Sequence, residues 1–189
     1  MSTPHRKAKP SMSTSPEHAA DQQNTHFDEY FRSNYVRLVR WLIFSGATGV
    51  EAHDAIQSAM EAAFRHWPRI STPDPYVRKV AMRYFLRERA RAAREKPTER
   101  TAAEPVATTH FEYRAEVQEV RAALASLPPA QRFVVALSMD GYTPKEISQL
   151  LEKPSSTVRS HLRFARRALR SKLIRGHGQA TREEVHDGP

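Results

Sequence analysis

The sequence predicts an all-α protein in which two small helical domains are joined by a flexible linker. Apolar side chains recur every three or four positions along most of the chain, which is the spacing of a helix with one buried face. The alternation of β-branched and polar residues that marks a half-buried strand is absent. Most of the 13 prolines lie in the N-terminal segment or between the periodic stretches, where they separate one helix from the next.

The chain of 189 residues is strongly basic, with a formal net charge of +9 and a sequence pI of about 10.2. This charge predicts a polyanionic partner. Nucleic acid fits better than a membrane, because the longest apolar run is far shorter than the roughly 18 residues of a spanning helix. The absence of cysteine excludes disulfides and thiolate metal sites. Since the N-terminus also lacks the apolar core of a secretory signal, we expect a cytoplasmic protein with no membrane insertion.

Three helices are predicted in the first half of the chain, where they form a domain at residues 25–95. Residues 1–24 carry few large apolar side chains and are expected to be disordered, because they cannot offset the entropy of ordering. Thr25 is a candidate cap for the first helix. A proline-rich loop follows the second helix. The expected helices cover residues 27–44, 50–67 and 76–95.

The second half is predicted to be a separate domain at residues 111–175. It is preceded by a linker at residues 96–110, which has two prolines and no apolar period. A helix at residues 111–127 and another that opens at a double proline supply apolar faces, and Met139 is expected to be buried in the second of these. Residues 176–189 lack such a period and are expected to form a frayed, disordered tail.

A helix-turn-helix is the clearest local pattern in the chain. Thr143 and Glu146 have the spacing of a capping box, in which each side chain accepts a hydrogen bond from the backbone N–H of the other, and Pro144 occupies the first helical position. This helix is expected to end before Pro154, because the residue before a proline disfavours the helical conformation. A second helix then begins at Ser155.

The second helix of this pair has one apolar face and one basic face. Its apolar stripe consists of Val158, Leu162, Ala165, Leu169 and Leu173. No acidic residue lies between Ser155 and Lys172, whereas an ordinary solvated helix mixes charges of both signs. Short polar residues and arginines can bond to base edges in the major groove, while further side chains contact phosphates. The first set is Ser156, Arg159, Ser160 and Arg163, and the second is Thr157, Arg166, Arg167 and Arg170.

The predicted third helix combines aromatic rings with a basic side. Rings beside arginines suit single-stranded bases, which stack on an aromatic ring or on a guanidinium plane. The simpler interpretation of Tyr76, Tyr84 and Phe85 is that each ring belongs to the core. The basic side is expected to be exposed and consists of Arg78, Lys79, Arg83, Arg87, Arg89, Arg91 and Arg94.

Together these stretches resemble the extracytoplasmic-function (ECF) group of bacterial RNA polymerase sigma factors, over roughly residues 27–173. The strongest match is to the fourth conserved sigma region and reads LPPAQRFVVALSMDGYTPKEISQLLEKPSSTVRSHLRFARRAL. Three other segments are similar to the second conserved region, namely FDEYFRSNYVRLVRWL, DAIQSAMEAAF and PYVRKVAMRYFLRERAR. The resemblance implies a specificity subunit of RNA polymerase that recognises two promoter elements.

The resemblance also implies a role for each surface. The family docks on core RNA polymerase through positions that match Asp54, Gln57, Ser58, Glu61 and Arg65. It captures the non-template strand of the minus-10 element through positions that match Ile70, Ser71, Thr72, Asp74, Tyr76, Lys79, Arg83, Tyr84 and Arg87. The family reads the minus-35 element in the major groove through positions that match Ser156, Arg159, Ser160 and Arg163. The expected partners are core RNA polymerase, promoter DNA and an inhibitory anti-sigma factor.

Four positions depart from the family pattern. Arg83 and Arg87 stand where many relatives have Asn and Asp, so the minus-10 preference of the family does not transfer to this chain. Glu152 replaces a frequent Gly in the turn of the helix-turn-helix, and Phe164 replaces a frequent basic residue. The minus-35 sequence therefore does not transfer either.

Two other functions are compatible with parts of the sequence. A stand-alone helix-turn-helix regulator would use the first domain for a ligand or for dimerisation, but that domain carries a basic stripe that neither role needs. An enzyme acting on nucleic acid would need a metal or phosphate site, yet no H-E-x-x-H motif, Gly-rich phosphate loop or acidic cluster is present. We therefore expect transcription initiation with no catalysis by this chain, no cofactor and no small-molecule substrate.

Overall fold

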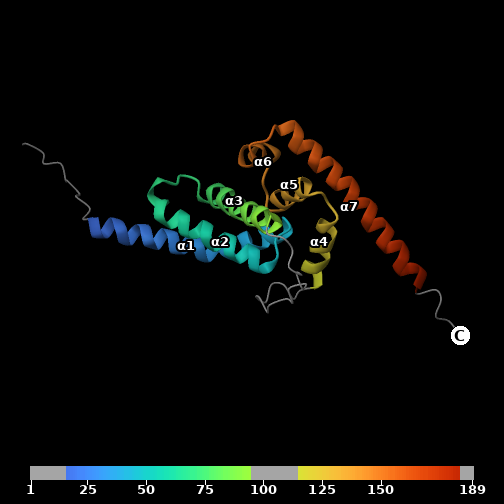
Figure 1. The fold of residues 1–189 in the computed structure, drawn as a ribbon, viewed down its shortest axis with the longest axis horizontal. Helices are drawn as coiled ribbons and strands as arrows, with labels where there is room; N and C mark the ends of the chain where they lie inside the picture. The colour runs from blue at the N-terminus through green and yellow to red at the C-terminus, as the bar shows by residue number, and fades with distance from the viewer. Residues whose placement is uncertain (1–15, 95–114, 184–189) are drawn as a thin grey trace, which may run out of the picture.

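The structure is a computed structural model that describes residues 16–94 and 115–183. Within these ranges it contains seven α-helices, one short 3-10 helix and no strand, which confirms the predicted all-α class (Figure 1). The elements are α1 (Pro16–Phe44), α2 (Gly49–His66), η1 (Trp67–Arg69), α3 (Pro73–Arg94), α4 (Ala115–Ala125), α5 (Pro129–Met139), α6 (Pro144–Leu151) and α7 (Ser155–Glu183). The predicted linker at residues 96–110 lies outside the described residues. No helix in the described ranges combines the length and the apolar character that a membrane span requires.

Helices α1, α2 and α3 pack side by side and form the first half of the molecule (Figure 1). A capping box begins α2, since Thr48 Oγ1 accepts the N–H of Glu51 (3.2 Å) and the Glu51 carboxylate accepts the N–H of Thr48 (2.8 Å). One side of α2 is a column of buried alanines, Ala52, Ala55, Ala59 and Ala63. Because these side chains are small, neighbouring helices can approach α2 closely.

The second half is built around α5, which packs against α6 and α7. All five residues from Phe133 to Leu137 are buried. The predicted capping box of α6 is confirmed, because Thr143 Oγ1 accepts the N–H of Glu146 (3.3 Å) and the Glu146 carboxylate accepts the N–H of Thr143 (2.8 Å). The predicted apolar face of α7 is confirmed for Val158, Leu162 and Ala165, which are buried, and for Leu169, which is partly buried. The side chain of Leu173 lies outside the described residues.

The two halves share one hydrophobic core. Helix α1 contacts α4 and α5, and α3 contacts α6. The rings of Phe85 on α3 and Phe133 on α5 meet edge to face, with centroids 6.2 Å apart. The sequence predicts two domains but not this contact between them.

Several predicted boundaries are wrong. Helix α1 begins at Pro16, inside the segment expected to be disordered, so Thr25 lies within the helix and does not cap it. The stretch PEHAADQQN favours a helix through Ala, Glu and Gln, although it offers no apolar face. Helix α7 likewise extends to Glu183, within the expected tail. Helix α3 begins at Pro73 rather than Tyr76, with a proline in its first turn.

Two side chains also differ from expectation. Met139 is 51% exposed because it is the last residue of α5, beyond the buried stretch of that helix. Arg78 was predicted on the exposed basic side of α3 but is 0% exposed. Its guanidinium lies between carboxylates from both halves of the chain, which supply the counter-charge that burial requires.

Candidate nucleic-acid and polymerase interfaces

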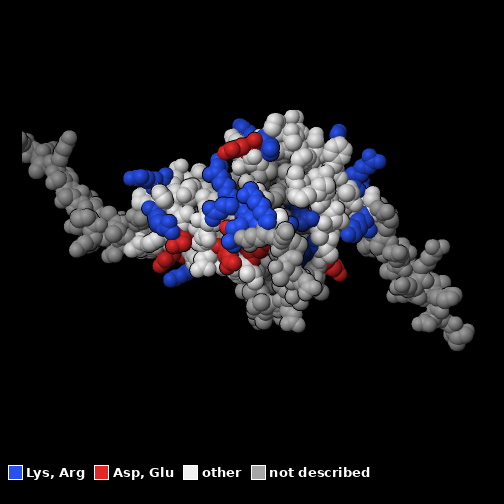
Figure 2. Space-filling view, viewed as in Figure 1, with Lys and Arg blue, Asp and Glu red and all other residues white. Residues whose placement is uncertain are grey.

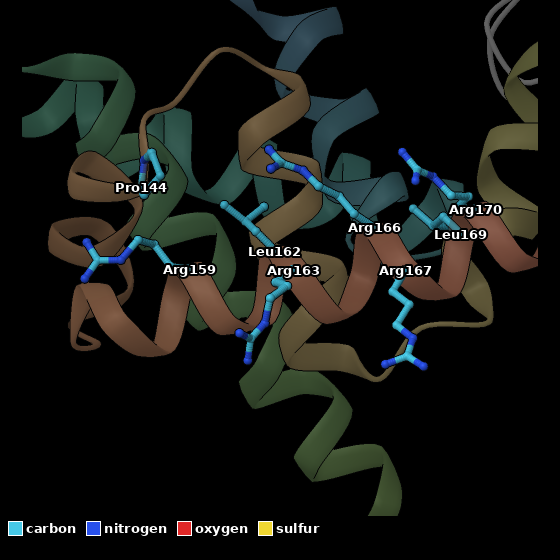
Figure 3. A pocket seen from close by; sticks show the side chains of 8 residues that line it. All are labelled: Pro144, Arg159, Leu162, Arg163, Arg166, Arg167, Leu169 and Arg170. Carbon is cyan, nitrogen blue, oxygen red and sulfur yellow. The ribbon is translucent and has the colours of Figure 1, made fainter.

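The outer face of α7 is basic along the described part of the helix. Arg163 and Arg167 point to one side of α7, whereas Arg166 and Arg170 point to the other (Figure 3). Of the residues predicted to contact duplex DNA, Ser156, Arg159, Arg163, Arg166, Arg167 and Arg170 are exposed, and Thr157 and Ser160 are half-buried. The structure therefore brings both predicted sets onto one accessible helix.

A tight turn sets the angle between α6 and α7. Glu152 adopts the left-handed conformation with φ of 52°, which glycine adopts most readily. Ser148 Oγ donates a hydrogen bond to the carbonyl of Lys153 (2.6 Å), and the N–H of Lys153 donates to the carbonyl of Ser148 (3.0 Å). These bonds satisfy polar groups at the end of α6 and fix the direction in which the chain enters α7.

Phe164 is an exposed aromatic residue on the basic surface of α7. The guanidinium of Arg163 lies over its ring, 5.1 Å from the centroid. A cation–π contact of this exposed kind contributes about 0.5–1 kcal/mol. The ring therefore restricts the direction of Arg163, which gives this departure from the family pattern a structural role.

The predicted strand-capture residues lie on the loop after α2 and along α3, where Lys and Arg side chains gather on the surface (Figure 2). Ser71, Thr72, Arg83 and Arg87 are exposed, and Ile70, Tyr76, Lys79 and Tyr84 are half-buried. The guanidinium of Arg87 lies 4.7 Å from the ring centroid of Tyr84. This pairing of a ring and a cation suits an unpaired base. Tyr76 and Tyr84 also pack against the core, which bears out the simpler interpretation in part, whereas contact with single-stranded bases stays a prediction.

Asp74 has partners that restrict any contact with DNA. Its carboxylate pairs with Arg37 of α1 and with Arg78 (2.9 Å), and it accepts a hydrogen bond from the hydroxyl of Tyr142. Burial opposes ionisation of Asp74, but Arg78 and the hydrogen bond from Tyr142 more than offset it and hold the pKa of Asp74 below its ordinary value. The structure thus favours an ion-pairing role for Asp74 over the predicted contact with DNA.

Arg78 connects Asp74 to the second half of the chain. Its guanidinium also pairs with Asp140, which follows α5 and has a side chain that is only 6% exposed. Burial disfavours the charge of Arg78, yet the carboxylates of Asp74 and Asp140 hold its pKa above the ordinary value. Arg37 (3.8 Å) and Arg40 (3.9 Å) of α1 approach Asp140 as well. We call Arg37, Arg40, Asp74, Arg78, Asp140 and Tyr142 the ionic cluster.

The predicted polymerase-binding residues share one side of α2. Asp54, Gln57, Glu61 and Arg65 are exposed, and Ser58 is half-buried. Two of them, Asp54 and Ser58, line a groove together with Tyr84 and Arg87 of α3. The predicted polymerase-binding surface therefore adjoins part of the predicted strand-capture surface.

An aromatic patch lies near the middle of α1 and the end of α2. Phe64 is 44% exposed, and Phe31 is also exposed. The ring of Phe27 lies 4.9 Å from that of Phe64 and 5.2 Å from that of Trp67. Exposed apolar side chains grouped beside charged ones are typical of a protein-binding surface.

The described residues contain no group of three or more His, Asp or Glu side chains that could hold a metal ion. Two of the scattered histidines have local partners instead. His53 Nδ1 lies 2.9 Å from the hydroxyl of Tyr35, and His66 Nδ1 lies 3.0 Å from the carbonyl of Ala62. These contacts are those of structural histidines.

A helix-turn-helix whose second helix is basic, joined to another helical unit with its own basic face, is typical of proteins that bind nucleic acid. Residues 117–169 match the family described as Sigma-70, region 4. The chain is 31% identical over 155 residues to the RNA polymerase sigma-E factor of Streptomyces coelicolor, covering 78% of this chain and 86% of that protein. It is 30% identical over 151 residues to the ECF RNA polymerase sigma factor SigM of Mycobacterium tuberculosis, covering 76% and 74%. The chain belongs to the ECF sigma factors of RNA polymerase.

Two solved structures share its fold. CnrH in complex with the cytosolic domain of CnrY aligns with a TM-score of 0.60 at 19% identity, covering 84% of this chain and 94% of that chain. The sigma factor RpoE in complex with the anti-sigma factor NepR from Bartonella quintana aligns with a TM-score of 0.62 at 18% identity, covering 79% and 97%. The likeness thus extends over both halves of the chain.

Proposed function

We propose that this ECF sigma factor directs core RNA polymerase to its promoters by reading the minus-35 element with α7 and capturing the minus-10 strand with α3. The observation that carries this proposal is the outer face of α7, which presents exposed arginines and no acidic residue between Ser155 and Lys172. A capped α6 and a hydrogen-bonded turn hold that helix in place. The exposed arginines of α3 and α7 give each reading unit its own attraction for DNA.

The proposed DNA contacts on α7 fall into two sets. Ser156, Arg159, Ser160 and Arg163 occupy the first turns and are assigned to base edges of the minus-35 element. Thr157, Arg166, Arg167 and Arg170 are assigned to phosphates, which fix the position of the helix but carry no sequence information. Each arginine that contacts a guanine with two hydrogen bonds contributes about 1–3 kcal/mol of discrimination.

Capture of the minus-10 strand is assigned to the loop before α3 and to α3 itself. Extruding a base costs a few kcal/mol, so the pocket must return that energy through stacking and charge. The stacked pair of Tyr84 and Arg87 and the exposed Arg83 offer both. The remaining assigned residues are Ile70, Ser71, Thr72, Tyr76 and Lys79.

Docking on core polymerase is assigned to the exposed side of α2. Its residues are Asp54, Gln57, Ser58, Glu61 and Arg65, and the aromatic patch that includes Phe31 and Phe64 extends this surface. A single helix-turn-helix binds duplex DNA weakly and with a strong dependence on salt. Attachment to polymerase supplies the missing affinity, because the second binding event becomes intramolecular.

The remaining assignments concern domains, location and partners. We assign promoter recognition to two units at residues 25–95 and 111–175, joined by the linker at residues 96–110. The protein acts in the cytoplasm on promoter DNA, and the chemistry of transcription belongs to core polymerase. Since RpoE is described in complex with an anti-sigma factor, a protein of that class is also a proposed partner of this chain.

Run-off transcription on a genomic promoter library tests this function. Core RNA polymerase is assayed alone, with the parent protein, with Arg163→Ala and with Arg32→Ala, which removes an exposed arginine of α1 outside every proposed contact. Defined start sites are expected only with the protein, and Arg163→Ala is expected to weaken them about tenfold or more. Arg32→Ala should match the parent. An absence of start sites, together with binding of duplex DNA by the protein alone, would support a stand-alone regulator instead.

A further inference from the structure

The two proposed reading units are not independent in this structure, because the start of α3 faces α6. One side of the groove between them is lined by Thr72, Pro75, Tyr76 and Lys79, and the other by Tyr142, Glu146, Gln149 and Leu150. The ammonium group of Lys79 forms an ion pair with Glu152, directly after α6. Three residues assigned to strand capture, Thr72, Tyr76 and Lys79, therefore face the helix-turn-helix.

The ionic cluster joins the same two halves. Arg78 is 0% exposed and takes one carboxylate, Asp74, from its own helix and another, Asp140, from the second half. The hydroxyl of Tyr142 in the second half also donates a hydrogen bond to Asp74 in the first half. Polar groups of each half are therefore paired with polar groups of the other half.

The interface between the two halves has features of an interface that can separate. The cluster runs from the buried Arg78 to Arg37 and Arg40, whose side chains reach the surface. Charged groups regain water when such an interface separates, and that hydration offsets part of the lost attraction. The halves also meet through apolar side chains such as Phe85 and Phe133, and interfaces between domains of one chain that combine polar and apolar contacts resemble transient protein interfaces. A closed and an open form can therefore both be populated.

We propose that the ionic cluster and the Lys79–Glu152 pair form an autoinhibitory latch, which holds the free protein closed with part of the strand-capture surface, namely Thr72, Tyr76 and Lys79, against α6. The inference rests on the proposed function, because it takes α3 to be the part that captures the minus-10 strand. Tyr76 and Lys79 are half-buried in the groove against α6, so an unpaired strand gains full access to them only after α6 has moved away. Any partner that binds the open form alone, such as core polymerase or melted promoter DNA, shifts the population toward it.

Distances between two spin labels measure the closed and open forms directly. The chain contains no cysteine, so Ala90→Cys on α3 and Ala168→Cys on α7, both at exposed positions, provide unique attachment sites. A single short distance is expected for the free protein. Longer and broader distances are expected for the variant with Asp140→Asn and Glu152→Gln, and for the parent bound to core polymerase. Glu119→Gln, which removes an exposed carboxylate of α4, should leave the distance unchanged.

Binding of a short fluorescein-labelled single-stranded DNA of mixed sequence measures the consequence. If the closed form holds about nine-tenths of the free protein, the double variant should bind this probe about tenfold more tightly. Adding Arg83→Ala should weaken binding of the probe by the parent and by the double variant alike, because Arg83 belongs to the strand-capture face and is exposed in the closed form. Far-UV circular dichroism checks the fold of Asp140→Asn. Glu152→Gln changes an exposed side chain and carries the test alone if Asp140→Asn is unstable.

Two results would overturn the latch: an unchanged distance in the double variant, or a free parent protein already spread over long distances. Longer distances without tighter binding of the single strand would overturn the autoinhibition. Run-off transcription separates these results from failure of the proposed function. Start sites that still depend on the protein and on Arg163 would show that promoter reading stands while the latch does not.

Discussion

Arg78→Met is the substitution with the most direct structural consequence. The guanidinium is 0% exposed and pairs with Asp74 (2.9 Å) and with Asp140. It also lies over two rings, 4.7 Å from the centroid of Trp41 and 5.2 Å from that of Tyr142. Methionine fills much of the same space and keeps contact with the rings. The change therefore isolates the loss of the cation, which leaves two carboxylates without their main partner.

The cost of that loss follows from the burial of the pair. Removing one member of a buried ion pair costs about 3–5 kcal/mol, because the other charge stays buried without compensation. Arg37 and Arg40 lie 3.8 and 3.9 Å from Asp140 and partly compensate its charge. We therefore expect the free energy of unfolding to fall by about 3 kcal/mol, at the lower end of this range.

Urea unfolding followed by far-UV circular dichroism measures this change. Arg83→Met is the matched control, since it makes the same replacement at an exposed position of the same helix, and it should alter stability by less than about 0.5 kcal/mol. Adding Asp74→Asn and Asp140→Asn to Arg78→Met should restore part of the loss, because the uncompensated charges are gone. A loss below about 1 kcal/mol, or no recovery in the triple variant, would refute the account of the ionic cluster as a buried ion network.

Three further predictions concern the cap of α6, the DNA-binding face and acid stability. Thr143→Ala removes the capping hydroxyl and is expected to cost about 1 kcal/mol in thermal unfolding, whereas Thr143→Ser should nearly preserve stability. Arg163→Ala should change the sequence preference for duplex DNA, while Arg166→Ala should weaken all sequences alike and reduce the salt slope of binding by about 1. The pKa of Asp74 is lower in the folded protein than its ordinary value of 3.8, so its ionised form stabilises the fold above that value. This stabilisation is lost as the pH falls through the folded pKa, and Asp74→Asn should flatten the acid side of the stability profile.

Each of these predictions has a contrary result. Equal stability of the Ala and Ser variants at position 143 would mean that the hydroxyl does not cap α6. Identical changes in preference and salt slope for Arg163→Ala and Arg166→Ala would remove the distinction between base and phosphate contacts. An acid profile of Asp74→Asn as steep as that of the parent would show that other carboxylates govern acid unfolding.

Much of the fold could be predicted because the signals that define it are local. The capping box of Thr143 and Glu146 spans a single helical turn, and Pro154 stops the preceding helix through its own ring. The apolar spacing from Val158 to Ala165 predicted the buried face of α7 for the same reason. The early start of α1 at Pro16 was not predicted, because residues 16–24 show no apolar period. The helix propensity of the Ala, Glu and Gln residues in this stretch favours a helix there without one.

The contact between the halves could not be predicted, because its members are distant in the sequence. Arg78 and Asp140 are separated by 62 residues, and Lys79 and Glu152 by 73. Periodicity alone places a charged side chain such as Arg78 on the surface, beside Arg83. Only the tertiary arrangement of two carboxylates reverses that assignment. The residues proposed to bind DNA and polymerase could not be identified from local sequence signals either, because their partners are other molecules.

The turn between α6 and α7 holds a residue that turn stability alone does not explain. Glu152 occupies a left-handed conformation in which glycine would relieve the strain. Its carboxylate meets Lys79 of the other half, and this hydrogen bond and the charge of Lys79 lower the pKa of Glu152. An acid at this position therefore supports the contact between the halves at the expense of the turn. Glu152→Gly should therefore stabilise the second half against unfolding and yet lengthen the distance between spin labels attached at Ala90→Cys and Ala168→Cys. A glycine variant that remained as closed as the parent would contradict this explanation of the strain.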